Sequence, residues 1–335
     1  MTVIVSKPAV NLREKLAELD KPTGIAGEAM LRAETPQEQF NLIGAGRRNW
    51  IINGDFQVSQ RGDFTTASSA SDLGYSVDRF KNFVKIVTAD VLHTKAATVN
   101  GEIKNTLKMT ATSTASGRFG FRQYIESGSN GKTVLAGKTA TVSVWMRSNH
   151  ADAGFYFYDY GNSGYFYRVK HSGSGEWEKL TLTFPIATGN VTSNYYGYEL
   201  NFTIQSNSNG TVSVTSGDYV EIAEPQFELG KVATPFEHRS YGEELALCQR
   251  YYEKWSGSKA MHPQYSSEAA GAYAAARELW NDFKVEKRAN PSVTVTGTHS
   301  PSAVNASIYG LGAQASEASS TASVRISAWT ADAEL

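Results

Sequence analysis

Hydrophobic and polar residues alternate with a period of two from residue 49 to about residue 230. Val142, Val144 and Met146 are separated by Ser143 and Trp145. Two further stretches alternate in the same way, with Leu180, Leu182 and Phe184 in one and Leu200, Phe202 and Ile204 in the other. Because successive side chains of a strand point to opposite faces, this pattern predicts strands with one buried face. Turns rich in Gly, Ser and Asn separate these stretches, and no helical segment lies between them. We therefore expect a mainly β fold, an antiparallel jelly-roll sandwich.

The first 48 residues have a different pattern, which predicts two short helices. Asn11 and Glu14 fit a capping box, as do Thr35 and Glu38, with Pro36 at the first helical position. The apolar side chains of these helices are Leu12, Leu16, Leu19, Phe40 and Ile43. Helices this short are not stable alone, so they must dock on something. Packing on the chain's own body and anchoring to a larger assembly both fit this pattern.

Residues 243–255 predict a single helix that follows the sandwich. Its apolar face would carry Leu245, Cys248, Tyr252 and Trp255, and Glu243 and Glu244 lie at its start, where the helix dipole favours negative charge.

Beyond residue 256 the alternation returns, in stretches at 280–285, 293–295 and 323–329. These stretches predict a small C-terminal β domain of at least four strands. The expected organisation is a helical segment at 1–48, a jelly roll at 49–240, and a linking helix with a β domain at 241–335.

Composition narrows the class of protein. The chain of 335 residues has a formal net charge of −1 and no strongly basic segment, which argues against a nucleic-acid partner. No apolar stretch is long enough to span a membrane, and the N-terminal apolar patch is too short for a signal peptide. We therefore expect synthesis in a cytosol. Cys248 is the single cysteine, so an intrachain disulfide is excluded.

Sequence signatures of enzymes are missing. The chain has no Gly-x-Ser-x-Gly elbow, no phosphate-binding glycine loop and no His-Glu-x-x-His motif. Paired carboxylates for glycan hydrolysis are set by spatial apposition, so the sequence leaves them open. Lys104–Lys108 and Arg118–Arg122 are mildly basic and predict solvated strand faces. We expect neither an enzyme nor a cofactor.

A tyrosine-rich segment offers candidates for ligand binding. Residues 155–168 predict a hairpin that turns through Gly161–Gly164. The candidates are Tyr156, Tyr158, Tyr160, Tyr165, Tyr195, Tyr196 and Tyr198. Aromatic rings cover the C–H surface of a sugar while their hydroxyl groups form hydrogen bonds. Tyrosine is also common in sandwich cores and between subunits, so packing is the alternative role, and the one we favour for any single residue.

An ordered set of motifs gives a more specific indication. It comprises 49–56 (NWIINGDF), 60–62 (QRG), 75–80 (YSVDRF), 224–230 (EPQFELG), 233–239 (ATPFEHR) and 244–252 (ELALCQRYY). This set resembles a family of bacteriophage tail-fibre and virion proteins that carry a carbohydrate-binding-type jelly roll. The residues before Asn49 and the last strand, which ends in 329–335, also look like phage virion proteins. The resemblance covers nearly the whole chain.

The resemblance implies a fold and a role. Asn53–Phe56 would form the first strand and Val220–Leu229 the last, with Phe56, Ile222, Phe227 and Leu229 in the core. The chain would be a structural protein of the virion, made in the host cytoplasm. It would form a homotrimeric fibre or spike for host attachment, bind a host surface glycan, and contact other particle proteins through residues 1–48. The alternative is a capsid decoration or head-fibre protein.

The resemblance also raises the question of a metal. Similar jelly rolls often hold a structural calcium between their first and last strands, and oxygen ligands suit that ion. Asp55 and Glu224 are the nearest candidates here. Gln57 stands where such modules commonly have Glu, so we expect no metal.

Overall fold

The computed structural model describes residues 48–62, 64–70, 74–126, 135–159, 165–187, 196–206, 210–261, 277–297, 303–315 and 324–334. The chain divides into two compact units, Met1–Arg48 and Asn49–Leu335. The two predicted N-terminal helices, with Leu12, Leu16, Leu19, Phe40 and Ile43, lie outside the described residues.

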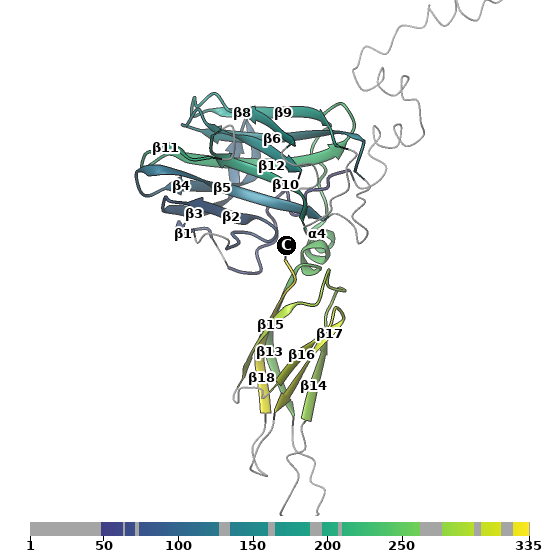
Figure 1. Cartoon of the computed structure of the whole chain (residues 1–335). Coiled ribbons are helices and arrows are strands. Elements are labelled where there is room, and N and C mark those ends of the chain that lie inside the picture. Colours follow the sequence, from purple (N-terminus) through teal and green to yellow (C-terminus); the bar gives the residue numbers. More distant parts are fainter. Residues whose placement is uncertain are drawn as a thin grey trace, which may run out of the picture. The chain divides into compact units, whose positions relative to one another are not determined.

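The larger part of the second unit is a sandwich of two antiparallel six-stranded sheets (Figure 1). One sheet has the order β1 (Ser68–Ser69), β3 (Ala89–Val99), β4 (Glu102–Ala111), β12 (Tyr219–Leu229), β6 (Thr139–Ser148) and β9 (Trp177–Pro185). The other has the order β11 (Val212–Val214), β5 (Ala115–Glu126), β10 (Tyr196–Ile204), β7 (Ala153–Asp159) and β8 (Tyr165–Lys170), and β2 (Lys81–Lys85) also pairs with β5. The predicted antiparallel, mainly β fold is confirmed.

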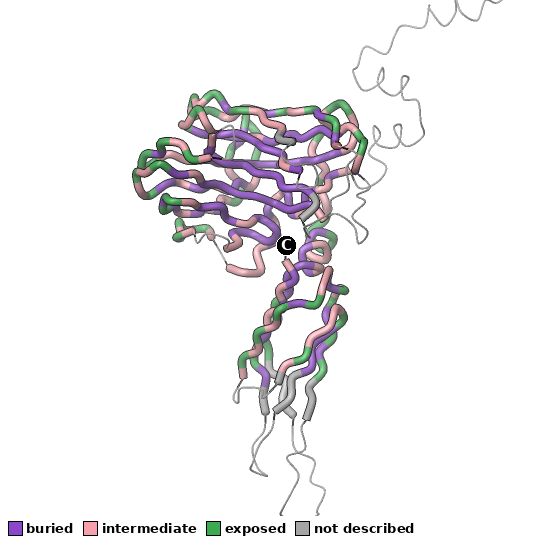
Figure 2. The backbone as a smooth tube through the Cα atoms, in the orientation of Figure 1, coloured by how far each residue is buried: buried purple, intermediate pink, exposed green. Residues whose placement is uncertain are grey.

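The core lies between these two sheets and follows the alternation in the sequence. The Val, Leu, Ile, Met and Phe residues that define the three stretches named above are all buried or packed against the core. Phe157 is fully buried, with ring centroids 5.3 Å from Tyr198, 4.5 Å from Phe184 and 5.8 Å from Phe227. Burying one such side chain contributes roughly 1.5–3 kcal/mol. Figure 2 shows buried residues along the strands and exposed residues at many of the connections between them.

The segment expected to be the first strand is a turn, which corrects that prediction. Asn53 and Phe56 have φ values of 62° and 53°, in the left-handed region that a strand excludes. Gly54 fits because a Cβ there would lie 2.8 Å from the Pro225 carbonyl oxygen. Phe56 is nevertheless fully buried, as predicted, and Val220–Leu229 lies within β12.

The linking helix is shorter than the sequence indicates. Helix α4 spans Tyr241–Gln249 and begins with a capping box between Ser240 and Glu243. The predicted helix to residue 255 is wrong, because Tyr252 begins strand β13 (Tyr252–Met261). Trp255 faces Trp329 across that strand's pairing with β18, with ring centroids 6.4 Å apart. Cross-strand packing of aromatic residues thus overrides the helical periodicity.

The C-terminal region contains two antiparallel three-stranded sheets. One has the order β13, β18 (Val324–Asp332) and β15 (Ser292–Gly297). The other has the order β14 (Arg277–Asp282), β17 (Gly310–Ala315) and β16 (Ala303–Ala306). A second core joins Phe283, Leu311, Ile326, Trp329 and Ala331. The stretches predicted at 293–295 and 323–329 fall on β15 and β18, whereas only residues 280–282 of the stretch at 280–285 are in a strand, β14, where Trp280 remains 48% exposed.

Candidate functional site: a buried polar joint

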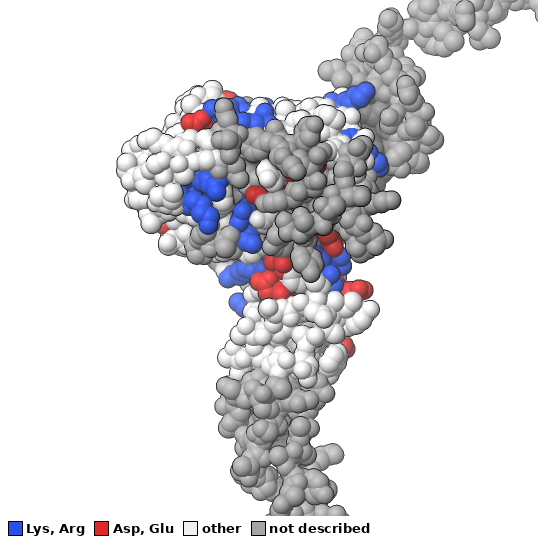
Figure 3. All heavy atoms as spheres, viewed as in Figure 1, with Lys and Arg blue, Asp and Glu red and all other residues white. Residues whose placement is uncertain are grey.

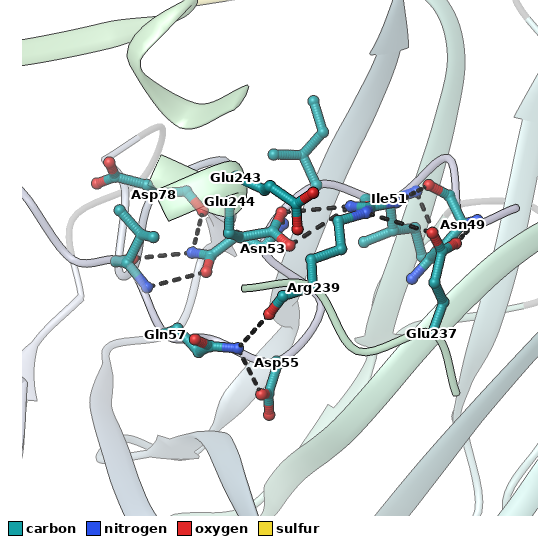
Figure 4. A network of polar contacts seen from close by, with 12 residues as sticks. Asn49, Ile51, Asn53, Asp55, Gln57, Asp78, Glu237, Arg239, Glu243 and Glu244 are labelled. Carbon is teal, nitrogen blue, oxygen red and sulfur yellow. Dashed lines mark hydrogen bonds and ion pairs between the residues drawn. The ribbon is translucent and has the colours of Figure 1, made fainter. Parts of the chain in front are cut away.

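The residues that carry the sequence motifs meet in a network of polar contacts where the sandwich begins (Figure 4). Asn53 is fully buried, and its amide nitrogen donates to the carbonyl oxygens of Val58 and Asp78, both at 2.8 Å. Its amide oxygen accepts from the Val58 N–H at 3.0 Å. Its own N–H donates to the Glu244 carboxylate at the start of α4. Asn53 therefore fixes the turn and ties it to the helix.

Arg239 fills the other side of the network. Its guanidinium donates to the carbonyl oxygen of Ile51 at 3.1 Å and to that of Asn49, and it lies 3.3 Å from Glu244 Oε1. The Asn49 side-chain oxygen accepts from the N–H of Phe227 in β12 at 3.0 Å. The network thus connects the beginning of the sandwich, its last strand and α4.

A second cluster joins the sandwich to the C-terminal sheets. Arg79 is 2% exposed and forms an ion pair with Glu334, which follows β18. The same guanidinium donates to the Tyr124 carbonyl oxygen at 2.8 Å and lies 3.6 Å from the centre of the Tyr251 ring. Arg61 lies 3.3 Å from both Asp332 and Glu334. Figure 3 shows acidic and basic side chains side by side at the level of α4.

Burial changes the acidity of groups in this cluster. It raises the pKa of Asp78 to about 6, although hydrogen bonds from Gln60 and the charge of Arg61 oppose that shift. It also raises the pKa of Tyr75 well above its ordinary value.

Lys287 forms a further buried contact close to the end of α4. Its ammonium is fully enclosed and donates to Gln249 O at 2.6 Å and to Glu253 Oε2 at 2.5 Å. Burial lowers the pKa of Lys287, and the Glu253 carboxylate opposes that shift.

The buried charged groups of these clusters stabilise the fold. Each buried charge described above has a partner of opposite charge, which is the condition for tolerating it in the interior. Within the described ranges, no group of three or more His, Cys, Asp or Glu could hold a metal ion. Cys248 is buried, and burial raises the pKa of its thiol, so it is a poor nucleophile.

The two calcium candidates lie close to each other, but they do not fit a calcium site. Glu224 Oε1 lies 2.8 Å from the ammonium of Lys104. Asp55 Oδ2 accepts from Gln57 at 2.7 Å, and the Asp55 carbonyl oxygen accepts from Asn105 at 2.9 Å. Calcium requires six to eight oxygen ligands. Here three of the oxygens that would supply them already accept hydrogen bonds from nitrogen donors, one of which is the positively charged Lys104 ammonium.

Two of the tyrosine candidates whose side chains the structure describes lie in the interior. Tyr156 is fully buried, with its hydroxyl donating to Gln205 O at 2.9 Å, and Tyr198 is buried against Phe157. Neither presents a ring to a ligand, and both support the fold. Tyr158 is half-buried, and Tyr165 and Tyr196 lie in β8 and β10. Tyr160 and Tyr195 lie outside the described residues.

Sequence reasoning missed Arg79, Glu334 and Lys104 as important residues. Arg79 belongs to a motif that the resemblance singled out, but nothing in the sequence links it to Glu334. Lys104 and Arg122 were expected on solvated faces, whereas their side chains are 8% and 11% exposed and form ion pairs. A buried cation is identified by its partner, and these partners lie far away in the sequence.

No family model matches the chain, and no curated protein sequence matches it. Solved structures do match. Tailspike protein 4 of bacteriophage CBA120, in a structure of its enzymatically active domain, has a TM-score of 0.34 at 12% identity, over 54% of this chain and 21% of that one. The module TmCBM61 in complex with β-1,4-galactotriose has a TM-score of 0.28 at 15% identity, and the match covers 56% of this chain and 100% of that one. The CBM22-1 xylan-binding domain of Paenibacillus barcinonensis Xyn10C has a TM-score of 0.30 at 14% identity, and the match covers 51% of this chain and 99% of that one.

The matched region spans about a fifth of the tailspike chain. Scores and identities this low do not indicate a function, and the antiparallel sandwich is established by the strand pairing itself. No helix among the described residues is long and apolar enough to cross a membrane.

Proposed function

We propose that the chain is a structural subunit of a bacteriophage particle, a trimeric fibre or spike that contacts a glycan on the host surface. One observation carries this proposal. The motifs that resemble phage virion proteins form the buried joint between the sandwich, α4 and the C-terminal sheets. They therefore serve to hold the β regions together. A fibre subunit needs such a joint, because its β regions must keep a fixed arrangement along the particle, whereas an enzyme needs accessible reactive groups.

Residues 1–48 are assigned to attachment on the particle. The division of the chain at Arg48 supports treating this segment as a separate part. Removing residues 1–48 is expected to abolish incorporation into particles while residues 49–335 keep their thermal unfolding transition. Retained incorporation would refute the assignment.

The position of the protein on the particle tests the proposal. An antibody raised against residues 49–335 is expected to label an appendage in electron micrographs of purified particles. Label on the head would favour a decoration or head-fibre protein instead, and particles without the protein would refute the proposal. Light scattering after size-exclusion chromatography is expected to give three times the chain mass of 36.5 kDa. A monomeric mass would contradict the proposal that the chain forms a trimeric fibre.

A further inference from the structure

Lys104 carries a positive charge into an acidic cluster on the sandwich. Its ammonium lies 2.8 Å from Glu224 Oε1 and 2.6 Å from Glu102 Oε2, and its side chain is only 8% exposed. Asp55 is connected to the same cluster through His238, whose ring nitrogens lie 3.9 Å from Asp55 Oδ2 and 3.9 Å from Glu224 Oε1. Glu102, which lies on the same strand as Lys104, and Glu224, which lies on β12, therefore share this ammonium, and Asp55 adjoins them through His238.

The contact joins strands where their backbone pairing stops. The pairing of β12 with β4 ends at Ile222 and Leu107. Two residues further along β12, Glu224 has a φ of 50° and lies in the irregularity that interrupts pairing with β6. Lys104 is the residue on β4 that Glu224 reaches. The ion pair thus continues the contact between these strands after the hydrogen-bonded ladder has ended.

Oxygen atoms around Glu224 and Asp55 accept hydrogen bonds from nitrogen donors. Pro225 O accepts from the Asn49 side chain at 3.3 Å, and both the carbonyl and the carboxylate of Asp55 accept hydrogen bonds. The Lys104 ammonium supplies donors to Glu102 and Glu224. A divalent cation would have to displace these donors and lie against a positive charge. Both requirements oppose binding.

We infer that the Lys104 ammonium takes the place of a bound cation at the closure of this sandwich, so that the fold does not depend on divalent metal ions. A charged side chain fixed in the chain cannot be removed by a chelator. The same geometry predicts what happens when the charge is lost. Replacing Lys104 by a neutral residue leaves the Glu102 and Glu224 carboxylates, which both contact its ammonium, without their cation, and their mutual repulsion favours recruitment of a hard cation such as calcium.

Thermal unfolding of the full chain tests this inference. The wild-type protein is expected to unfold at the same temperature in excess EDTA and in excess CaCl₂. Lys104→Gln is expected to unfold at least about 2 °C lower in EDTA. Calcium should restore a measurable part of that loss, and calorimetry should detect calcium binding to the variant alone.

Lys108→Gln provides a matched control on the same strand. Lys108 lies over the Tyr219 ring at 4.1 Å and outside the carboxylate cluster. This variant is expected to show no response to calcium. Should Lys104→Gln be insoluble, refolding yields from denaturant with calcium and with EDTA replace the melting comparison. Loss of wild-type stability in EDTA would overturn the inference, as would equal calcium responses of the two variants.

Discussion

The guanidinium of Arg79 and the carboxylate of Glu334 form an ion pair in the interior of the protein, although the two residues are 255 positions apart. Arg79 precedes β2 in the sandwich, and Glu334 follows β18 in the C-terminal sheets. Their side chains are 2% and 5% exposed. The pair therefore connects the two β regions where solvent does not screen the charges.

Removing Arg79 should weaken the joint strongly. Arg79→Met leaves the Glu334 carboxylate buried, with only Arg61 as a cationic partner among the ion pairs described. Loss of one partner of a buried pair typically costs about 3–5 kcal/mol, and a loss of this order is expected in the free energy of unfolding. Denaturant titration measures it.

Lys170→Met serves as the control for that experiment. Lys170 pairs with Asp152 at 2.5 Å, but their side chains are 41% and 33% exposed. Exposed pairs contribute about 1 kcal/mol or less. Equal losses in the two variants would show that burial of the Arg79 pair has no energetic consequence.

Asp78 should make stability depend on pH in the acidic range. The pKa of Asp78 is about 6 in the folded protein, whereas its ordinary value, which applies to the unfolded chain, is 3.8. As pH rises, the unfolded chain therefore loses this proton at a lower pH than the folded protein does. The contribution of Asp78 is therefore fully present below the ordinary value and is lost as pH rises to about 6. A shift of this size corresponds to roughly 3 kcal/mol.

Asp78→Asn removes that titration. Denaturant titrations across this pH range are expected to show a smaller fall in stability for the variant than for the wild-type protein. Identical pH profiles for the two proteins would contradict the assignment of this pKa to Asp78.

The hydrogen bonds of the Asn53 side chain should contribute to the free energy of unfolding beyond the effect of its left-handed backbone conformation. Asn53→Gly keeps the left-handed φ but leaves Val58 N, Val58 O and Asp78 O without this partner. A loss of at least about 2 kcal/mol in unfolding free energy is expected. Asn100 also has a left-handed φ, at 48°, but lies exposed in the turn between β3 and β4. Asn100→Gly should change stability by about 0.5 kcal/mol or less. Similar losses would mean that the Asn53 hydrogen bonds add nothing.

The sequence predicted those parts of the fold that depend on local pattern. Val142, Leu200 and Phe202 lie in alternating stretches, and each is buried in a strand as expected. The helix that was expected to reach residue 255 ends at Gln249, because Tyr252 and the residues after it pair with β18. That pairing depends on residues more than sixty positions away, which a local period does not contain.

The joint could be predicted in part. The motifs around Asn53, Asp78 and Arg239 were identified by resemblance, but their mutual contacts were not. Charge alone suggested a solvated face for Lys104, whereas the irregularity at Glu224 brings a buried carboxylate to it. A departure from regular strand pairing of this kind leaves no periodic signal in the sequence.

The proposed function requires that the β regions bind a glycan without cleaving it. The most direct test is to incubate the purified chain with bacterial surface polysaccharides and to measure both binding and the release of reducing ends. Saturable binding with no release of reducing ends is the predicted result. Absence of binding, or release of reducing ends above a blank, would contradict it.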